Sequence, residues 1–409
     1  MSEPVLLSGP PLSDGAERSA SHVARLGRLP QGGAALIEAL ERSDLRGRGG
    51  ASFPVGTKWR AVASRSRGDA AVLVNGAEGE PLSHKDRLLM ERRPHLVLDG
   101  AHLAAQSTGA RDVVAYIGED HHRAAAAMRA ALSERPDAER RITRIVDDAP
   151  ARYVSGEECA AVNFVNDGIA LPTSIPPRPF ERGIGGRPTL VQNVETLAHA
   201  ALIARYGDAW YRAQGVGGSS GTALLTVSGA VQRRGVVEVP MGTRLGDVMA
   251  ECGGVVDAGE AVLLGGYFGT WVSTTNAWAL PVDATLLRQR GAVLGCGVVA
   301  VLPAGHCGVA ETSRILDYLA DQSARQCGPC VFGLRAVADA VAGIAAGRAA
   351  RGELQRVQRW AGLLPGRGAC RHPDVAAGLL QSALAVFAED FASHAARRGC
   401  GAGAQGQAA

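Results

Sequence analysis

Apolar and polar positions along the first 215 residues fall into blocks of two kinds. Some blocks repeat apolar residues at the spacing of one helix face, and the shorter blocks between them are continuously apolar, as in buried strands. This alternation predicts a parallel sheet covered by helices, which is an α/β fold. The predicted helices are Ala34–Ser43, Pro94–Gln106, His121–Arg135 and Cys159–Asn166, and the predicted strands are Ala70–Asn75, Asp112–Ile117 and Arg141–Val146.

The pattern changes twice further along the chain. From about Thr222 to Thr270, apolar and polar residues alternate between turn glycines and lead into a short helix, which predicts a small β-grasp-like module. Ala292–Leu302 adds one more buried strand. From Glu311 onward the spacing is helical and is sufficient for a four-helix bundle. Its predicted helices are Thr312–Ala324, Gly333–Arg348, Glu353–Leu364 and Pro373–Arg397.

These changes of pattern predict the domain organisation. Residues 21–215 form the α/β domain, residues 216–305 the β-grasp-like domain and residues 306–398 the helical bundle. Residues 1–20 and 399–409 have the composition of a disordered leader and a disordered tail.

Composition narrows the functional classes. Apolar residues make up 46% and charged residues 20% of the chain, as in soluble globular proteins. A net charge of +3 without a basic run argues against a dedicated nucleic-acid binder. Neither a signal peptide nor an apolar run long enough to span a bilayer is present, so we expect a cytoplasmic protein with no direct membrane span. In that compartment the eight cysteines are expected to be ligands or buried thiols.

The segment Asp44–Trp59, DLRGRGGASFPVGTKW, is unusually rich in glycine and positive charge. Backbone N–H groups of glycines can approach an anion closely, and Arg or Lys supplies the charge that a phosphate needs. The GxGG spacing matches neither the P-loop nor the dinucleotide fingerprint. Lys58 is one of only two lysines in the chain. The segment is therefore a phosphate cradle or, in the simpler interpretation, a flexible surface loop.

Two further loops follow predicted strands. GAEGEP at Gly76–Pro81 comes directly after an apolar strand, where open α/β sheets bind ligands. SGEE at Ser155–Glu158 runs into a predicted helix. Because helix N-termini favour negative charge, we expect these glutamates to act as caps and hydrogen-bond acceptors rather than as acid catalysts.

Three cysteines suggest a metal site in the helical bundle. Cys327 and Cys330, in QCGPC, open its second predicted helix, and Cys370 precedes its last one. Thiolates at helix N-termini are stabilised by the helix dipole, which suits metal ligation. The spacing fits a zinc site, completed by His372, or part of an iron–sulfur cluster. Buried structural thiols are the simplest alternative.

Taken together, these motifs resemble the NADH-binding, flavin-bearing subunit of respiratory complex I. The same family includes related flavoproteins of NAD-linked hydrogenases and formate dehydrogenases. The resemblance covers the chain from about Ala34 to Ala396, with the motifs in the family's order. They are DLRGRGGASFPVGTKW, VNGAEGEPLSHKDR, SGEE, GRPTLVQNVET, the β-grasp-like module (the family's soluble-ligand-binding domain) and QCGPC with Cys370.

The resemblance implies FMN in a Rossmann-like first domain, hydride transfer from NAD(P)H to the flavin, and single-electron transfer to an iron–sulfur cluster. The flavin carries the chemistry, so no catalytic side chain is expected. The implied FMN residues are Gly47, Arg48, Gly49, Gly50, Lys58, Asn75, Glu78, Gly156, Glu157, Glu158, Asn193 and Thr196. Phe53 and Glu80 would contact NADH, and Cys327, Cys330 and Cys370 would hold the cluster.

The sequence departs from the family pattern in the cluster motif. Ala324 stands where the family has the first cysteine of C-x-x-C-x-x-C. Three thiolates could hold a [3Fe–4S] cluster, or a [4Fe–4S] cluster whose fourth ligand comes from Asp321, Cys307 or a partner. In the flavin and nucleotide sites, Ala77 replaces an aspartate, and Ile175 and Arg178 replace a lysine and a phenylalanine.

Three functions remain open at this stage. The leading one is an FMN- and iron–sulfur-dependent NAD(P)H-oxidising subunit that passes electrons to other iron–sulfur subunits, peripheral to a membrane complex. The second is an electron-transfer subunit with a non-NADH donor such as ferredoxin, suggested by Ile175 and Arg178. The third is a non-redox assembly protein that keeps the fold, suggested by Ala77 and Ala324.

Overall fold

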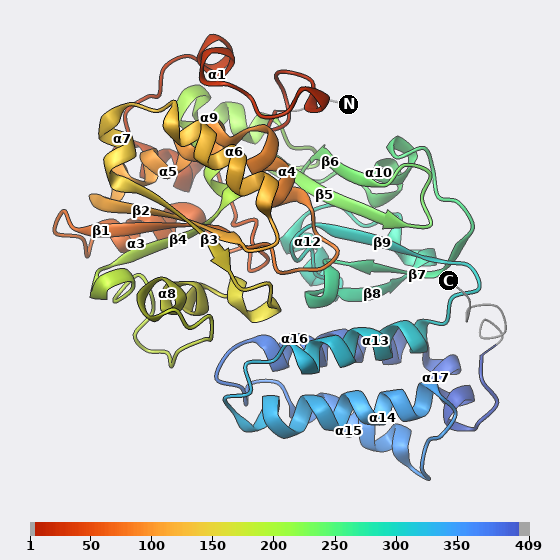
Figure 1. Cartoon of the computed structure of the whole chain (residues 1–409). Helices are drawn as coiled ribbons and strands as arrows, with labels where there is room; N and C mark the ends of the chain where they lie inside the picture. The colour runs from red at the N-terminus through yellow and green to blue at the C-terminus, as the bar shows by residue number, and fades with distance from the viewer. Residues whose placement is uncertain (1–4, 401–409) are drawn as a thin grey trace. The chain divides into compact units, whose positions relative to one another are not determined.

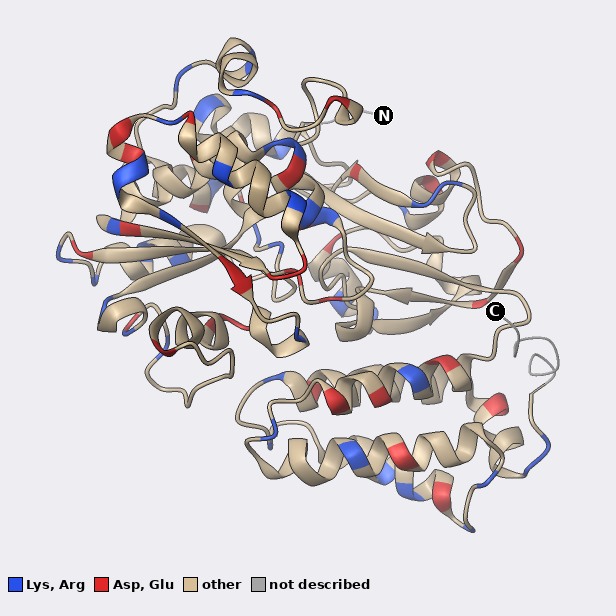
Figure 2. Cartoon of the chain, in the orientation of Figure 1, with Lys and Arg blue, Asp and Glu red and all other residues tan. Residues whose placement is uncertain are grey.

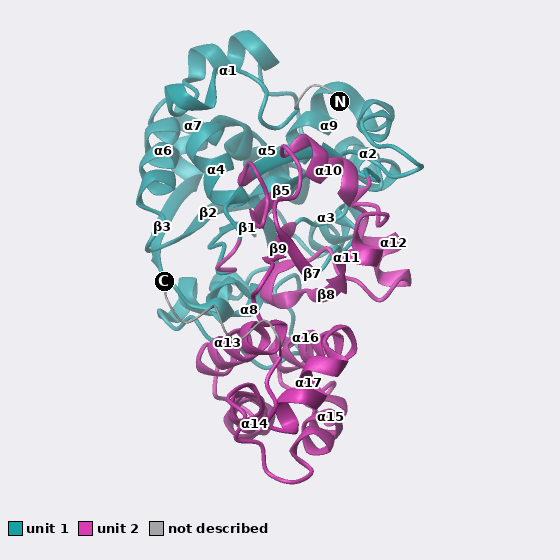
Figure 3. Cartoon of the chain, turned by 90° about the vertical axis from the view of Figure 1, so that its right-hand side faces the viewer, with its two compact units in different colours: residues 1–79, 83–225, 236–243 teal, residues 80–82, 226–235, 244–409 magenta. Residues whose placement is uncertain are grey.

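The computed structural model describes residues 5–400. The chain forms two compact units, coloured separately in Figure 3. Unit 1 comprises residues 1–79, 83–225 and 236–243, and unit 2 comprises residues 80–82, 226–235 and 244–409. The chain enters unit 2 at residue 226, returns to unit 1 for residues 236–243 and then stays in unit 2. The predicted three-domain boundaries remain predictions.

Unit 1 contains a parallel four-stranded sheet in the order β3-β2-β1-β4. Its strands are β1 (Ala70–Gly76), β2 (Ala110–Gly118), β3 (Thr143–Ala149) and β4 (Thr189–Asn193). Its helices are α1 (Ser19–Leu26), α2 (Ala34–Arg42), α3 (Val55–Ala63), α4 (Lys85–Arg92), α5 (Pro94–Thr108), α6 (His122–Ser133), α7 (Asp137–Ile142), α8 (Glu158–Asp167) and α9 (Val194–Ala213), with short 3₁₀ turns at Leu12–Asp14, Tyr153–Gly156 and Ile184–Gly186.

Side-chain alternation along the strands divides the core between the two faces of this sheet. Val72 and Val74 of β1 join the larger cluster, which also contains apolar residues of α5 and α9. Ala71 and Leu73 face the other way and join the smaller cluster with residues of α8. Figure 1 shows α4, α5, α6 and α9 on one side of the sheet and α8 on the other. Both faces are covered, which explains why the central strand β1 is apolar and buried from Ala70 to Val74.

The predicted α/β fold is confirmed, with boundaries within a few residues for every helix and strand proposed before residue 170. Several elements were not predicted. They are the helices α1, α3, α4 and α7, and the strand β4 with the helix α9 that follows it. The last five residues of the arginine–glycine segment, Val55–Trp59, therefore belong to helix α3 rather than to a loop.

The second sheet has five strands in the order β6-β5-β9-β7-β8, as a β-grasp-like module requires. β5 pairs parallel with β9, and β7 pairs antiparallel with both β8 and β9. The predicted strand at Ala292–Leu302 is shorter and begins later, as β9. The elements are β5 (Thr222–Gly229), β6 (Gly235–Pro240), α10 (Leu245–Glu251), β7 (Ala258–Leu264), η4 (Gly266–Phe268), β8 (Thr270–Ser273), α11 (Thr274–Ala277), α12 (Ala284–Gln289) and β9 (Val298–Pro303).

The C-terminal bundle consists of α13 (Gly308–Asp321), η5 (Pro329–Leu334, a π-helical turn), α14 (Arg335–Ala345), α15 (Glu353–Leu363), α16 (His372–Val386) and α17 (Ala388–Ala395). The single last helix predicted for Pro373–Arg397 is wrong, because α16 and α17 meet at an angle of 88°. Phe387, at the break, packs its ring against Trp271 at a centroid distance of 5.2 Å.

Acidic and basic positions are interspersed along the bundle helices (Figure 2). Within residues 5–400, no single helix is long and apolar enough to cross a membrane, and only the bent pair α16 and α17 passes that test by length and composition.

The N-terminal segment is attached to unit 1. The backbone N–H groups of Val5, Leu6 and Leu7 donate to the carboxylate of Glu238 at 2.9–3.0 Å, and Leu6 is fully buried. This order over residues 5–20 differs from the disorder that composition predicts for residues 1–20. Residues 1–4 and 401–409 lie outside the described range.

A buried ionic cluster holds α1 against α5. His22 Nε2 lies 2.8 Å from Asp99 Oδ2, and His22 Nδ1 lies 3.4 Å from Glu17 Oε2. Arg135 and Arg205 also pair with Asp99, and Arg25 pairs with Glu17. Burial opposes the charged imidazole, but the two carboxylates outweigh it and raise the pKa of His22 above 6.5. The pKa of Glu17 falls to about 2, because His22 and Arg25 outweigh the effect of burial.

The attachment of α1 should therefore weaken at alkaline pH. A raised folded-state pKa means that the contribution of charged His22 is complete below its unfolded pKa of 6.5 and is lost as pH rises through the folded value. We expect His22→Gln to cost about 1.5–3 kcal/mol near pH 6 and less at pH 9, since it removes a charge-assisted hydrogen bond. Urea unfolding at several pH values measures this, with the exposed His306→Gln as control. An equal cost at all pH values would contradict the prediction.

Candidate functional site

The polar residues singled out in the sequence gather at one edge of the parallel sheet. Asn75 is the last residue but one of β1, Asn193 is the last residue of β4, and the two are direct partners in the parallel register. The chain runs outward from β1 through β2 to β3 and then returns to place β4 on the opposite side of β1. This reversal is a topological switch point, where ligands of open α/β sheets bind beyond the carboxyl ends of the strands.

The arginine–glycine loop lies beside this edge. Arg46 and Pro54 form an isolated bridge, and the N–H of Gly47 donates to the carbonyl of Phe53 at 2.9 Å, which closes the loop between them. Gly50 has φ +106°, a conformation that favours glycine. A Cβ on Gly49 would lie 3.3 Å from Cβ of Asn193, so the exposed loop tip passes directly over the end of β4.

Arg48 points into the protein rather than toward solvent. Its Nη2 donates to the carbonyl of Thr222 at 2.8 Å and to the hydroxyl of Tyr211 at 3.2 Å. Its backbone N–H donates to Oγ1 of Thr196 at 2.9 Å. Arg48 and Thr196 were both predicted to contact FMN. The structure uses both the guanidinium and the backbone N–H of Arg48 to fasten the loop, so Arg48 supports the site rather than offering these donors to a ligand.

Two helices begin at the same edge with polar caps. Oδ1 of Asn193 accepts from the N–H groups of Glu195 and Thr196 at the start of α9. Glu157 caps α8 by accepting from the N–H groups of Cys159 and Ala160, which confirms the capping role predicted for this glutamate. Burial and the neighbouring Glu158 raise the pKa of Glu157. Both N-termini are favourable places for an anion.

Three contacts link side chains of the loop, β1 and the start of α8 into one polar group. Nδ2 of Asn75 donates to the carbonyl of Gly156 at 2.8 Å. Nζ of Lys58 lies 2.8 Å from Oε2 of Glu158, and both side chains are about a quarter exposed. Arg178 approaches the other oxygen of Glu158 at 4.0 Å. This polar group is therefore half-exposed and carries both hydrogen-bond donors and acceptors.

A buried ionic network, which sequence reasoning missed, adjoins Asn193. Lys85, which is 1% exposed, lies 2.7 Å from Asp86 and 2.8 Å from Glu195. The other oxygen of Asp86 accepts from Nδ2 of Asn193 at 2.6 Å. The sequence did offer one signal for Lys85, because the chain contains only two lysines and Lys85 is the second of them. The network fixes the orientation of the Asn193 side chain.

The network perturbs all three ionisable groups. Burial opposes the charge of Lys85, but Asp86 and Glu195 outweigh it and raise the pKa of Lys85. Burial, with repulsion from Glu78 and Glu195, raises the pKa of Asp86 to about 7. Burial also opposes ionisation of Glu195, but Lys85 and Arg48 outweigh it and lower its pKa to about 2.

Two predicted ligand residues have their carboxylates engaged elsewhere. Glu78 accepts from the hydroxyl of Ser83 and from the N–H groups of Asp86 and Arg87, so it caps α4. Glu80, in unit 2, accepts from the N–H of Tyr267 at 2.9 Å and is buried. By contrast, the ring of Phe53 is 51% exposed.

The bundle brings the three predicted cluster cysteines together. Burial opposes ionisation of Cys327, but N–H groups of Ala369 and Cys330 and the Cys330 thiol lower its pKa. Burial and the neighbouring thiols of Cys327 and Cys370 raise the pKa of Cys330 to about 12. These interactions link Cys327 with Cys330 and Ala369, and Cys330 with Cys370, although the three sulfurs do not all lie within 4.8 Å of one another.

The additional ligands considered for this cluster lie elsewhere. Nε2 of His372 is 2.7 Å from the carbonyl of Leu319, and the ring is buried against Phe268. Asp321 pairs with Arg335 at 3.3 Å. Cys307 lies beside His394. Among residues 5–400, the one group of three ligand atoms within 4.8 Å of one another contains neither His372 nor Asp321, nor any of the three predicted cluster cysteines, so the Cys₃His zinc hypothesis gains no support.

Comparison with known protein families accounts for this combination of modules. Residues 40–201 match the Nuo51 FMN-binding domain, residues 224–266 the SLBB domain, and residues 310–394 the NADH-ubiquinone oxidoreductase-F iron-sulfur binding region. Fold and site thus define a flavin- and iron–sulfur-binding subunit of an oxidoreductase.

Individual relatives make the assignment more specific. The chain is 32% identical to the F-2 subunit of NADH-quinone oxidoreductase from Rhizobium meliloti, over 89% of this chain and 90% of that one. It is 30% identical to the F subunit of the Escherichia coli enzyme, over 87% and 83%, and 27% identical to the HndC subunit of the NADP-reducing hydrogenase of Solidesulfovibrio fructosivorans, over 90% and 77%. The chain belongs to the family of NADH-quinone oxidoreductase F subunits, as the sequence motifs predicted.

The fold agrees with solved structures. The crystal structure of an NAD⁺-reducing [NiFe]-hydrogenase in the air-oxidized state superposes with a TM-score of 0.82 at 32% identity, over 88% of this chain. The present chain spans 62% of that hydrogenase chain. The predicted fold class and the predicted oxidoreductase class, an NADH dehydrogenase-type flavoprotein with electron transfer to iron–sulfur, are therefore confirmed.

Proposed function

We propose that this chain oxidises NAD(P)H with bound FMN and passes single electrons through an iron–sulfur cluster to a partner subunit, as a cytoplasmic protein peripheral to a larger complex. The observation that carries the proposal is the register pairing of Asn75 and Asn193 at the switch point, under the tip of the glycine loop. The relatives named above are themselves subunits, which supports a partner.

The residues present fit FMN. A phosphate needs a cation and backbone donors, and Lys58 and the exposed Gly49 supply them. The polar edge of a flavin ring needs fixed donors and acceptors, which the half-exposed side chains of Asn75 and Asn193 supply. A Cβ at position 49 would lie 3.3 Å from Cβ of Asn193, so glycine at this position lets a ligand approach the Asn193 side chain.

Bound FMN would accept a hydride from a nicotinamide and release the electrons singly. The protein's own part is to bind and orient. We assign the phosphate to Gly47, Gly49, Gly50 and Lys58, with Arg48 and Thr196 holding the loop in place. We assign the ring edge to Asn75, Gly156, Glu157, Glu158 and Asn193, and to Glu78 the support of α4.

We assign the nucleotide contacts from the solvent exposure of the side chains. The exposed ring of Phe53 is available to stack against a nicotinamide or adenine. Glu80 would have to share its carboxylate between a nucleotide and the N–H of Tyr267. Ile175 is 38% exposed, and Arg178 is paired only loosely with Glu158, so both remain accessible to a donor.

The donor assignment can be tested directly. Protein purified without oxygen should contain stoichiometric FMN, and its flavin absorbance should bleach with NADH or NADPH. Bound FMN that reduced ferredoxin bleaches and neither nucleotide does would instead establish a ferredoxin donor. Absence of both FMN and iron would establish the non-redox alternative.

For the cluster we propose three protein thiolates, from Cys327, Cys330 and Cys370. Asp321 and Cys307 are engaged with other residues, so any fourth ligand comes from outside this chain. The resulting group is a [3Fe–4S] cluster or a [4Fe–4S] cluster completed by a partner.

Ala324→Cys should complete the set within the chain. Ala324 is buried, and a cysteine there restores the four-thiolate ligation typical of [4Fe–4S] clusters. In the chain purified without a partner, where only three thiolates are present, we expect iron to rise from about three to about four per FMN, with the spectrum of a [4Fe–4S] cluster. Iron analysis and electron paramagnetic resonance measure this. Ala320→Cys, four residues earlier within α13 and similarly buried, should leave the iron content unchanged. An unchanged iron content in Ala324→Cys would contradict the prediction.

A further inference from the structure

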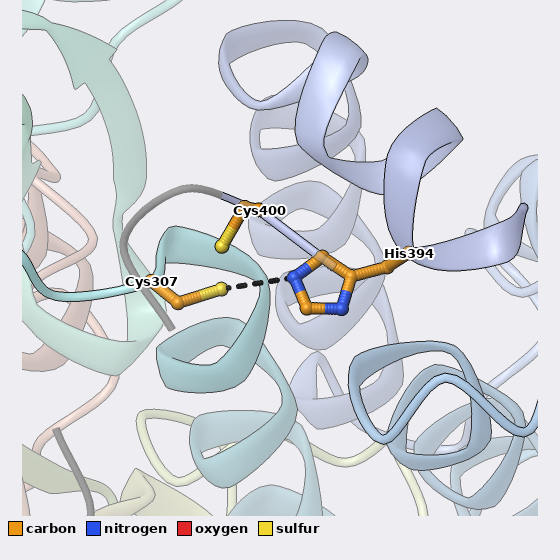
Figure 4. A group of neighbouring side chains, drawn as sticks. All are labelled: Cys307, His394 and Cys400. Carbon is orange, nitrogen blue, oxygen red and sulfur yellow. Dashed lines mark hydrogen bonds between the residues drawn. The ribbon is translucent and has the colours of Figure 1, made fainter. Parts of the chain in front are cut away.

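Three ligand side chains outside the proposed cluster converge near the C-terminal end of the bundle (Figure 4). Cys307, His394 and Cys400 place one ligand atom each within 4.8 Å of the other two. Sγ of Cys307 lies 3.4 Å from Nε2 of His394. His394 is buried, and both cysteines are half-buried. No other group of three such atoms is this close within residues 5–400.

The position of Cys307 is fixed by the start of α13. Cys307 is the N-cap residue of that helix, and its sulfur accepts from the N–H of Ala310 at 3.4 Å. A Cβ on the next residue, Gly308, would lie 2.2 Å from the ring of Phe387, so α13 begins directly against the break between α16 and α17. The sulfur therefore faces α17. Burial and the neighbouring Cys400 raise the pKa of Cys307 to about 11, although the N–H groups at the start of α13 oppose this, so the thiol is protonated until a metal replaces the proton.

The position of Cys400 is fixed by a turn after α17. The N–H of Arg397 donates to the carbonyl of His394 at 2.9 Å, and the N–H of Arg398 donates to the carbonyl of Ser393 at 3.0 Å. These two bonds define a Schellman motif, with Arg397 in the left-handed conformation at φ +62°. Oγ of Ser393 also donates to the carbonyl of Gly399. The turn reverses the chain and returns Cys400 to His394.

We propose that Cys307, His394 and Cys400 bind a zinc ion. Two thiolates and an imidazole are preferred ligands of Zn²⁺. With bond lengths of about 2.3 Å to sulfur and about 2.0–2.1 Å to nitrogen, a tetrahedral ion separates the two donors by roughly 3.5 Å. The observed separation is 3.4 Å. Ligands of an iron–sulfur cluster sit on different irons and stand farther apart, so this group suits a single ion.

Zinc binding displaces protons and needs neither an oxidant nor a reductant. Zn²⁺ replaces one proton on each thiol, the two protons pass to solvent, and no electron is transferred. His394 binds as neutral imidazole through Nε2. Three ligands leave a fourth position of the ion open to water or to a ligand from outside the chain. The ion would join the N-cap residue of α13 to the last turn of α17 and to the segment beyond it.

Metal analysis of the purified holoprotein, with its FMN and iron in place, tests the proposal. We expect about one zinc per chain in the wild type and X-ray absorption showing two sulfur ligands and one imidazole nitrogen. Cys400→Ser and His394→Asn should lose the zinc and retain FMN. Cys296→Ser, a half-buried cysteine outside both groups, and Cys327→Ser should retain the zinc.

Each contrary result overturns the proposal. Wild-type protein expressed with added zinc but containing none would do so, as would zinc that persists in both Cys400→Ser and His394→Asn. A disulfide between Cys307 and Cys400, seen as the loss of two hydrogens in the intact mass of protein kept under reducing conditions, would also overturn it. FMN content serves as the folding control, so a variant without zinc but with full FMN is informative.

Discussion

Lys85→Met is expected to lower the free energy of unfolding by about 3–5 kcal/mol, because it leaves the buried carboxylates of Asp86 and Glu195 without their cation. Methionine matches the length of the lysine stem, so little packing is lost. The cost comes from desolvated negative charge, and it should therefore shrink as pH falls and the two carboxylates take up protons. Urea unfolding of the apoprotein at about pH 8 and about pH 5.5 measures both effects.

The second lysine provides a matched control. Lys58 makes a comparable ion pair with Glu158, but both side chains are about a quarter exposed. Such a pair contributes about 1 kcal/mol or less, so Lys58→Met should hardly change stability. It should weaken FMN binding instead, since Lys58 is assigned to the phosphate. Equal destabilisation by Lys85→Met and Lys58→Met would contradict the prediction, because burial of the Lys85 ion pairs would then add nothing to the cost.

Gly49→Val is expected to weaken FMN binding at least ~100-fold, about 2.7 kcal/mol, while changing stability by less than about 1.5 kcal/mol. Gly49 is exposed, and φ at this position is not positive, so a side chain causes little backbone strain. The new methyl groups would project beside Asn193, into the space assigned to the flavin. Titration of flavin-free protein with FMN, followed by fluorescence, gives the affinity.

Gly343→Ala is the control for this substitution. A Cβ there meets nothing within 4 Å, and the residue lies inside α14, where alanine is favoured over glycine. It should bind FMN as the wild type does. Unchanged FMN affinity in Gly49→Val would exclude the loop tip from the flavin site, whatever the outcome of the donor experiment.

Periodicity alone predicted most of the fold. Strands β1 to β3 and helix α5 carry strong apolar patterns of fixed period, and these were found within a few residues. β4 was missed because only five residues form it and the helix α9 follows without a loop. The signal was present, since Asn193 followed by Glu195 resembles an N-cap at the start of a helix. The break at Phe387 depends on Trp271 and Gly308, which are distant in sequence.

For the site, too, the sequence predicted some features and missed others. The motifs predicted which segments meet, and the pairing of Asn75 with Asn193 agrees with that prediction. They did not predict where side chains point. Arg48 in a glycine-rich loop suggests a phosphate ligand, yet Tyr211 and Thr222 attract its guanidinium inward. Glu78 was predicted to bind the flavin, yet it satisfies N–H groups of α4. Both outcomes depend on tertiary contacts that no local pattern encodes.

The order β3-β2-β1-β4 also constrains when the proposed cofactor can bind during synthesis. β1, β2 and β3 follow one another and can pair as the chain leaves the ribosome, but Asn75 gains its partner only after β4 has been made. Arg48 must wait still longer, for Thr222. The loop is thus the first part of the site to be synthesised and the last to be fastened. A nascent chain that ends before β4 would carry the glycine loop without the wall against which it closes, so flavin loading follows the folding of unit 1.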